Sequence, residues 1–133
     1  MTESKVGKGK KVSRIIYLLL CALFAVGIVL QVALAGMAIF MNGLHWNHHS
    51  MLIHLFGFNI PIAMLVVAIF GKMPRWAYWQ VFGLLLLMFL MYFTANITAV
   101  FSIVSALHPV VAMGLFIFSI WTVHKAWKFS IVK

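Results

Sequence analysis

Four long apolar runs dominate the sequence, and none of them contains Asp, Glu, Lys or Arg. They cover residues 15–41, about 51–71, 76 to about 101, and about 103–123. The hydrocarbon core of a bilayer is about 30 Å thick, so a helix that crosses it needs roughly 20 predominantly apolar residues. Each run is long enough for this, and the sequence therefore predicts four transmembrane helices.

The fold class follows from the small number of these runs and from the bilayer as their solvent. Backbone N–H and C=O groups find no water in hydrocarbon, so only helices and closed β-barrels cross it. A barrel needs at least about eight short strands of alternating polarity, whereas these runs are few and continuous. Because short connections make sequential helices antiparallel neighbours, we predict an all-α, integral membrane, four-helix up-down-up-down bundle with the second run diagonal to the fourth.

All ten Lys and Arg residues lie on one side of this predicted topology. They fall in residues 1–14, between the second and third runs, and in residues 125–133. The positive-inside rule then places both termini in the cytoplasm. We expect a multi-pass protein of a bacterial inner membrane, with basic cytoplasmic tails at 1–14 and 125–133 flanking a four-helix domain at 15–124. The net charge of +9 indicates anionic lipid rather than nucleic acid as a partner.

A secretory signal peptide is the alternative interpretation of the first run. A basic stretch precedes the run, and Ala-Leu-Ala at residues 33–35 resembles a cleavage site. The run continues to Met41, however, well past the roughly 7 to 15 residues of a signal-peptide core. We therefore expect it to span the membrane. Cys21 is the only cysteine, and inside an apolar helix it is expected to be an inert packing residue.

The histidines are distributed unevenly along the predicted topology. His124 lies at the inner end, and the other five belong to the outer side: His45, His48, His49, His54 and His108. His54 and His108 should lie at similar depths in the second and fourth helices. The diagonal of a square bundle is about 11 to 14 Å, so these two imidazoles could hold a haem iron between them.

Neighbouring residues fit such a haem site. Gly57 follows His54 by three residues and Ala112 follows His108 by four, so a small residue shares each ligand face and lets a flat macrocycle approach. Pro61 lacks a backbone donor and predicts a kink near Gly57. The outer connections contain no Lys or Arg to pair with haem propionates, so anchoring should be weak. The remaining donors there are Asn42, Trp46, Asn47, Ser50 and the histidines that do not ligate the haem.

Two other interpretations remain open. Imidazole and thioether groups suit a first-row metal such as copper, and the connection at residues 42–51 offers His45, His48 and His49 with Met41 and Met51 nearby. If that connection were helical, His45 and His49 would share one face. Alternatively, the chain binds no cofactor and is an assembly or structural subunit whose small-residue faces pack against partner helices.

These motifs carry two resemblances. Histidines on alternate helices of a four-helix bundle resemble membrane b-type cytochromes, especially the four-helix halves of haem A synthase, which implies a haem held by His54 and His108. The segments QVALAG at 31–36 and ALHPVVA at 106–112, with the histidine-rich outer connection, resemble an uncharacterised bacterial family of small four-span membrane proteins. The second resemblance covers residues 15 to 125 and implies the topology but no activity.

The sequence thus predicts a membrane protein that binds one b-type haem near its outer face and works in redox transfer or haem handling. His124 is the only histidine at the inner end, so one chain cannot hold a second bis-histidine haem to carry electrons across the bilayer. Other membrane subunits or a redox partner are candidate partners. No hydrolase motif, phosphate-binding loop or nucleophile-base pair is evident, and we assign no catalytic residue.

Overall fold

The computed structural model describes residues 7–132, and all regular structure in this range is helical. The elements are α1 (Lys8–Phe40), α2 (His45–Phe56), α3 (Asn59–Phe70), α4 (Arg75–Asn96), α5 (Ser102–Ser105), α6 (His108–Trp127) and the π-helical turn η1 (Lys128–Val132). Helices α2 and α3 continue one another, and so do α5, α6 and η1, which gives four spans long and apolar enough to cross a membrane. The predicted four-helix membrane fold is confirmed.

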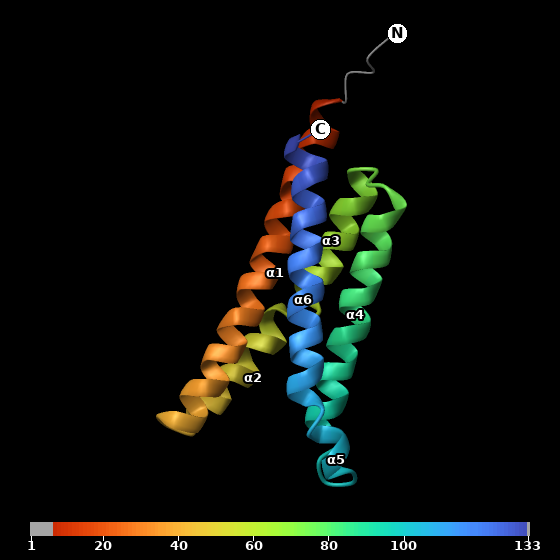
Figure 1. The fold of residues 1–133 in the computed structure, drawn as a ribbon. Helices are drawn as coiled ribbons and strands as arrows, with labels where there is room; N and C mark the ends of the chain where they lie inside the picture. The colour runs from red at the N-terminus through yellow and green to blue at the C-terminus, as the bar shows by residue number, and fades with distance from the viewer. Residues whose placement is uncertain (1–6, 133) are drawn as a thin grey trace.

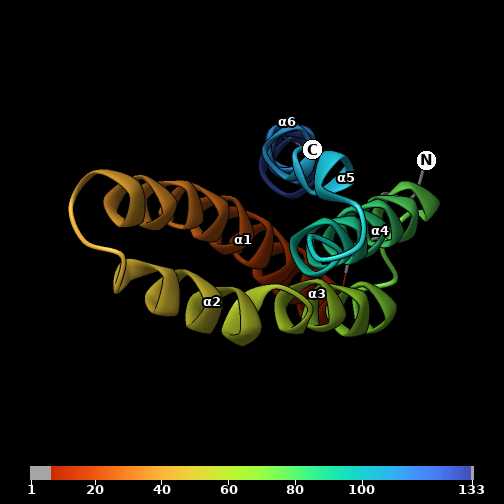
Figure 2. The ribbon, with the colours of Figure 1, turned by 90° about the horizontal axis from the view of Figure 1, so that it is seen from below.

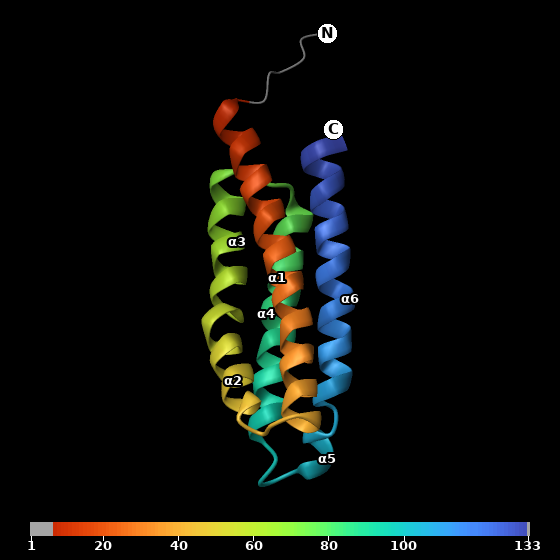
Figure 3. The same cartoon turned by 90° about the vertical axis from the view of Figure 1, so that its left-hand side faces the viewer.

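The four spans alternate in direction (Figures 1 and 3). The start of α1, the α3–α4 connection and η1 lie at one end, here called the basal end, and the α1–α2 connection and α5 lie at the opposite, distal end. Helix α1 packs against α2, α3 and α6, while α4 packs against α3 and α6. The second span is therefore diagonal to the fourth, as the short connections predicted.

The two ends of the chain are more helical than predicted. Helix α1 begins at Lys8 rather than at residue 15, and α6 with η1 continues the last span to Val132. At 1.5 Å per residue α1 is about 50 Å long, which exceeds the thickness of hydrocarbon, so its basic first turns extend beyond the apolar layer. Residues 1–6 and 133 of the predicted tails lie outside the described range.

The second span breaks where the proline predicted a kink. Pro61 has no N–H to donate to the carbonyl of Gly57, and a turn at residues 57–58 interrupts the helix between α2 and α3, although both residues keep helical dihedral angles. The side-chain amide of Asn59 donates to the carbonyl of Leu55 at 2.7 Å and replaces a lost backbone hydrogen bond there. The break lets α2 take a different direction from α3, as Figure 3 shows.

The outer connection differs from the prediction, because most of residues 42–50 are helical. The side chain of Asn42 accepts a hydrogen bond from the N–H of Leu44 at 2.9 Å, and such local turns favour the start of a helix. Helix α2 accordingly begins at His45. His45, His48 and His49 therefore lie on a regular helix instead of a loop.

The third span ends earlier than predicted, at Asn96 instead of about residue 101. The amide of Asn96 and the hydroxyl of Thr94 bond to carbonyls four residues before them, at 2.7 and 2.8 Å. Such local bonds compete with the backbone ladder and suit helix ends. Helix α6 then begins at His108 with Pro109 in its first turn, where the missing N–H costs nothing.

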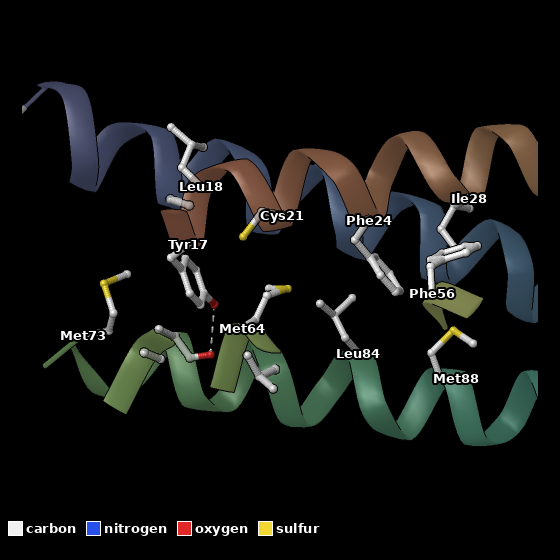
Figure 4. Packing of buried hydrophobic residues seen from close by; sticks show 14 of the residues in the cluster. Tyr17, Leu18, Cys21, Phe24, Ile28, Phe56, Met64, Met73, Leu84 and Met88 are labelled. Carbon is white, nitrogen blue, oxygen red and sulfur yellow. Dashed lines mark hydrogen bonds between the residues drawn. The ribbon is translucent and has the colours of Figure 1, made fainter. Parts of the chain in front are cut away.

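The tightest packing lies in the basal half and the centre of the bundle (Figure 4). Tyr17 and Phe24 of α1, Met64 of α3, and Leu84 and Met88 of α4 are all almost completely buried. The hydroxyl of Tyr17 donates to the carbonyl of Ala77 at 3.3 Å, so the one polar atom of this side chain is satisfied. Cys21 is also buried in this cluster. The core joins α1, α3 and α4 and holds the basal end closed.

Close contact between α1 and α2 depends on Gly27. A Cβ at this position would lie 2.8 Å from the ring of Phe56, which is too close for carbon atoms in contact. Phe56 is buried and packs edge-on against Phe24 with 5.6 Å between ring centroids. Its ring therefore has little room to move away.

We predict that Gly27→Ala destabilises the protein by about 1 to 3 kcal/mol, because the added methyl group overpacks the α1–α2 contact. Gly114→Ala is the matched control, since a Cβ there meets nothing within 4 Å and gains helix propensity of roughly 0.5 to 1 kcal/mol. Thermal unfolding of both variants in the same detergent, followed by tryptophan fluorescence, measures the difference. Equal melting temperatures would contradict the inferred contact.

Candidate functional site

The spans separate toward the distal end. Figures 1 and 2 show the α1–α2 pair diverging from the α4–α6 pair. The space between the pairs is a cavity of about 1090 Å³, here called the wide cavity. Its polar lining residues are Gln31, Trp46, His49, Ser50, His54, Tyr92, Asn96 and His108. The rest of its wall is apolar, so a small set of polar groups converges on an apolar space, as is typical of ligand sites.

His54 reaches the wide cavity from α2 and meets a tyrosine of α4. Its Nδ1 lies 3.1 Å from the hydroxyl oxygen of Tyr92. The ring of Phe58 stacks on Tyr92 with 5.3 Å between centroids and holds the phenol in place. Tyr92 was not predicted from the sequence. It could have been found as a phenol four residues before Asn96, in an apolar run that carries several other polar side chains.

His108 enters the same cavity from the first turn of α6. Its Nδ1 lies 3.1 Å from the carbonyl oxygen of Met91 and 3.0 Å from the hydroxyl oxygen of Thr94. A carbonyl only accepts hydrogen bonds, so Nδ1 carries the proton and Nε2 keeps a lone pair. The early end of α4 makes this contact possible, because it brings the last turn of α4 alongside the start of α6.

His49 is the third histidine of the wide cavity, and sequence reasoning had grouped it with His45 and His48. Its Nδ1 lies 3.0 Å from the backbone carbonyl oxygen of Gln31, while the Gln31 amide donates to the carbonyl of His49 at 2.9 Å. This reciprocal pair ties α2 to α1. It also assigns the Nδ1–H tautomer to His49, for the same reason as in His108.

Gln31 itself leaves one polar atom without a partner. The side chain is 6 % exposed, and its Oε1 accepts no hydrogen bond from residues 7–132. Gln31 lines the wide cavity, and buried polar groups are nearly always hydrogen-bonded. The Oε1 atom of Gln31 therefore stays available as an acceptor at the edge of the wide cavity.

The copper ligands considered from the sequence are not brought together in one cluster. His45 and His48 meet each other, with 3.3 Å between their Nδ1 atoms, on an exposed face outside the wide cavity. His49 bonds to α1 instead. Met41 and Met51 are largely exposed and do not line the cavity. Within residues 7–132, His, Cys, Asp and Glu form no group of three that could hold a metal ion.

The two small residues proposed beside the histidines have different positions. Ala112 lines the wide cavity next to Pro109. Gly57 does not line it, and a Cβ there would lie 2.7 Å from the methyl group of Met88. Gly57 therefore lets the break between α2 and α3 lie close to Met88 of α4. Small residues on the cavity wall also come from α1, namely Ala33, Ala35 and Gly36 of the QVALAG segment.

The arrangement offers imidazole nitrogens to a bound group. His49, His54 and His108 each engage Nδ1 in a hydrogen bond. None of their Nε2 atoms makes a hydrogen bond within the described part of the chain. Neither Lys, Arg, Asp nor Glu lines the wide cavity. The site can thus supply neutral nitrogen ligands in an apolar setting, whereas carboxylate-dependent proton transfer has no group there.

Comparison with known proteins gives one match. No curated protein and no solved structure matches the chain, so neither comparison supports the resemblance to b-type cytochromes. A family model matches residues 31–99, more than half of the chain, and this segment begins at Gln31 and includes His49, His54 and Tyr92. The matched family is described as a family of unknown function (DUF6220), and the chain belongs to it.

Proposed function

We propose that the wide cavity binds one b-type haem between His54 and His108, and that the protein works in redox transfer or haem handling at the membrane. The observation that carries the proposal is that histidines from the second and fourth spans line one cavity. Ionisable residues inside a membrane bundle are rare and tend to mark functional sites. A haem is the flat, largely apolar group that two neutral imidazoles on opposite sides would ligate.

The hydrogen bonds of the two histidines support this proposal. Histidines that ligate metals usually engage their second ring nitrogen with a carbonyl or another polar group, which orients the ring. His108 does so through the carbonyl of Met91, and His54 has the hydroxyl of Tyr92. The cavity volume of about 1090 Å³ lies just above the range of roughly 300 to 1,000 Å³ that is usual for ligand sites, which suits a large ligand.

The polar rim of the cavity supports only weak anchoring of haem propionates. Trp46, Ser50 and Asn96 line the cavity, whereas Asn42 and Asn47 do not. These neutral donors lack the strength of the charge-assisted bonds that Arg and Lys make with carboxylates. Such a haem would exchange more readily than one held by cations, which suits haem handling as well as electron transfer at one membrane face.

We predict that the detergent-purified protein from haem-replete cells is red. Its dithionite-reduced minus oxidised spectrum should show the sharp bands of low-spin, six-coordinate haem at about one haem per chain, because two imidazoles fill both axial positions. Weakly anchored haem dissociates from the protein during extraction, so the measurement is repeated after hemin is added. A protein that gives no six-coordinate spectrum even with hemin would refute the proposal and favour a cofactor-free subunit.

We further predict that His54→Ala and His108→Ala each abolish the six-coordinate spectrum, since each removes one axial ligand. His48→Ala is the matched control, because His48 lies on the same helix as His54 but outside the wide cavity. Absorbance spectra and metal analysis of the three variants measure haem and copper together. Copper that is lost in His48→Ala but kept in His54→Ala and His108→Ala would replace the haem proposal with copper handling.

We also propose that the basal end faces the cytoplasm of a bacterial cell. All the Lys and Arg residues of the described range belong to that end, in the first turns of α1, around the α3–α4 connection, and from Lys125 onward. Short loops rich in Lys and Arg are retained on the cytoplasmic side. The wide cavity would then open toward the outer face.

In a Cys21→Ala background, a cysteine at Asn47 should react with an impermeant thiol reagent in spheroplasts, and a cysteine at Lys8 should not. Both positions are exposed, so burial does not limit the reaction. As a control, both cysteines should be labelled after the membrane is permeabilised, which shows that both are reactive. Labelling of position 8 in intact spheroplasts would overturn the orientation.

A further inference from the structure

A second cavity lies between α4 and α6 near the basal end, on a part of the bundle that the wide cavity does not reach. Its volume is about 340 Å³, and it is lined by Trp76, Trp79, Gln80, Phe118, Trp121 and Lys125. None of these residues lines the wide cavity. We call it the basal pocket. Three indoles, an ammonium group and an amide in one small space form an unusual lining for a helix–helix seam.

Gln80 gives the first indication that the basal pocket holds a ligand. The side chain is 2 % exposed, and neither its Nε2 nor its Oε1 has a hydrogen-bond partner among residues 7–132. Buried amides in native proteins nearly always have partners. Gln80 lines the basal pocket, so a molecule bound there is the nearest source of the missing partner.

Lys125 gives the second indication, which is electrostatic. Its Nζ lies 5.1 Å from the ring centroid of Trp76 and 5.1 Å from that of Trp121, so the ammonium group is held between two indoles. The only acidic residue of the whole chain is Glu3, so residues 7–132 contain no carboxylate side chain to pair with this cation. The positive charge is positioned for an anion that comes from outside the fold.

The depths of these groups match the layers of a phospholipid. Helix α4 begins at Arg75, and Gln80 lies about 7 to 8 Å further along its axis. Trp76 and Trp79 occupy the first turns, where indoles favour the headgroup level. The ammonium group of Lys125 lies 5.1 Å from the ring centroid of Trp76 and would lie near the surface with that indole. Gln80, further along α4, would then lie deeper, near the level of lipid ester groups. Phe118 extends the wall toward hydrocarbon.

We propose that the basal pocket is a binding site for one anionic phospholipid. The lipid phosphate pairs with the ammonium group of Lys125, an ester carbonyl accepts a hydrogen bond from Nε2 of Gln80, and an acyl chain lies against Phe118. A free phosphate ion would satisfy Lys125 but would leave the apolar wall and the buried amide uncovered. The bilayer that surrounds the four spans supplies this occupant at high local concentration.

The test is a titration of the detergent-purified full chain with dioleoyl phosphatidylglycerol or dioleoyl phosphatidylcholine, with bound lipid counted by native mass spectrometry. We expect one phosphatidylglycerol to bind about tenfold more tightly than phosphatidylcholine, because both lipids bring a phosphate to Lys125 but the choline cation of phosphatidylcholine is repelled by the same ammonium group. Lys125→Met should reduce this preference to near unity. Lys128→Met is the matched control, because it removes a neighbouring charge that does not line the pocket, and it should keep the preference.

A second variant tests the amide independently of charge. Gln80→Leu fills the same space without an unpartnered amide, so it should fold at least as stably as wild type in lipid-free detergent. It should nevertheless weaken phosphatidylglycerol binding several-fold and reduce the rise in melting temperature that the lipid causes in wild type. Equal binding of the two lipids to wild type would overturn the proposal. An equal loss of preference in Lys125→Met and Lys128→Met would also overturn it, because that result would indicate diffuse surface charge and not a site. Unchanged lipid binding by Gln80→Leu would overturn it as well.

Discussion

The absence of water from hydrocarbon is the constraint on which the rest of this structure depends. Every backbone N–H and C=O inside the bilayer needs a partner from the chain itself, which forces the four apolar runs into helices. Polar side chains obey the same rule. Ser119 and Thr122 in the middle of α6 donate to carbonyls of their own helix at 2.7 and 2.9 Å. Such residues are satisfied locally and leave nothing for a ligand.

Two sets of polar groups that are not satisfied within their own helix line cavities. Around the wide cavity, His49, His54 and His108 each bond to a residue of another span and present their second ring nitrogen. In the basal pocket, the Gln80 amide has no hydrogen-bond partner among residues 7–132, and that range offers no carboxylate side chain to Lys125. The two sites differ in chemistry, because one offers neutral nitrogen ligands and the other offers a cation and an amide.

The division between a closed and an open half of the bundle follows from how the spans pack. Tyr17, Met64 and Leu84 join α1, α3 and α4 in a core without solvent exposure. The second span changes direction at Gly57. On the distal side of this break, α2 stays with α1 through the Gln31–His49 pair. The α1–α2 pair thus moves away from α4 and α6 as a unit. A rigid basal core with an open distal end is a suitable frame for binding a large flat group.

The sequence by itself determined the features that depend on local chemistry. Hydropathy predicted four spans, short connections predicted the diagonal relation of the second and fourth, and Pro61 predicted the break at Gly57. These predictions are confirmed because each reflects a property of a segment that its surroundings do not alter. The prediction that His54 and His108 lie near the same end of the bundle also followed from the sequence, because it needs only the order of the spans. That they ligate a haem remains a prediction.

Only the tertiary structure decided which side chains share a cavity. Successive helical residues point about 100° apart, so the start of α2 at His45, instead of about residue 51, sets the direction of every histidine after it. That start turned His49 toward Gln31 and left His45 and His48 outside. The roles of Tyr92, Gly57 and Gln80 likewise depend on which neighbouring helix each one faces. Helix rotation and contact are settled by packing between distant segments, and no local pattern in the sequence encodes them.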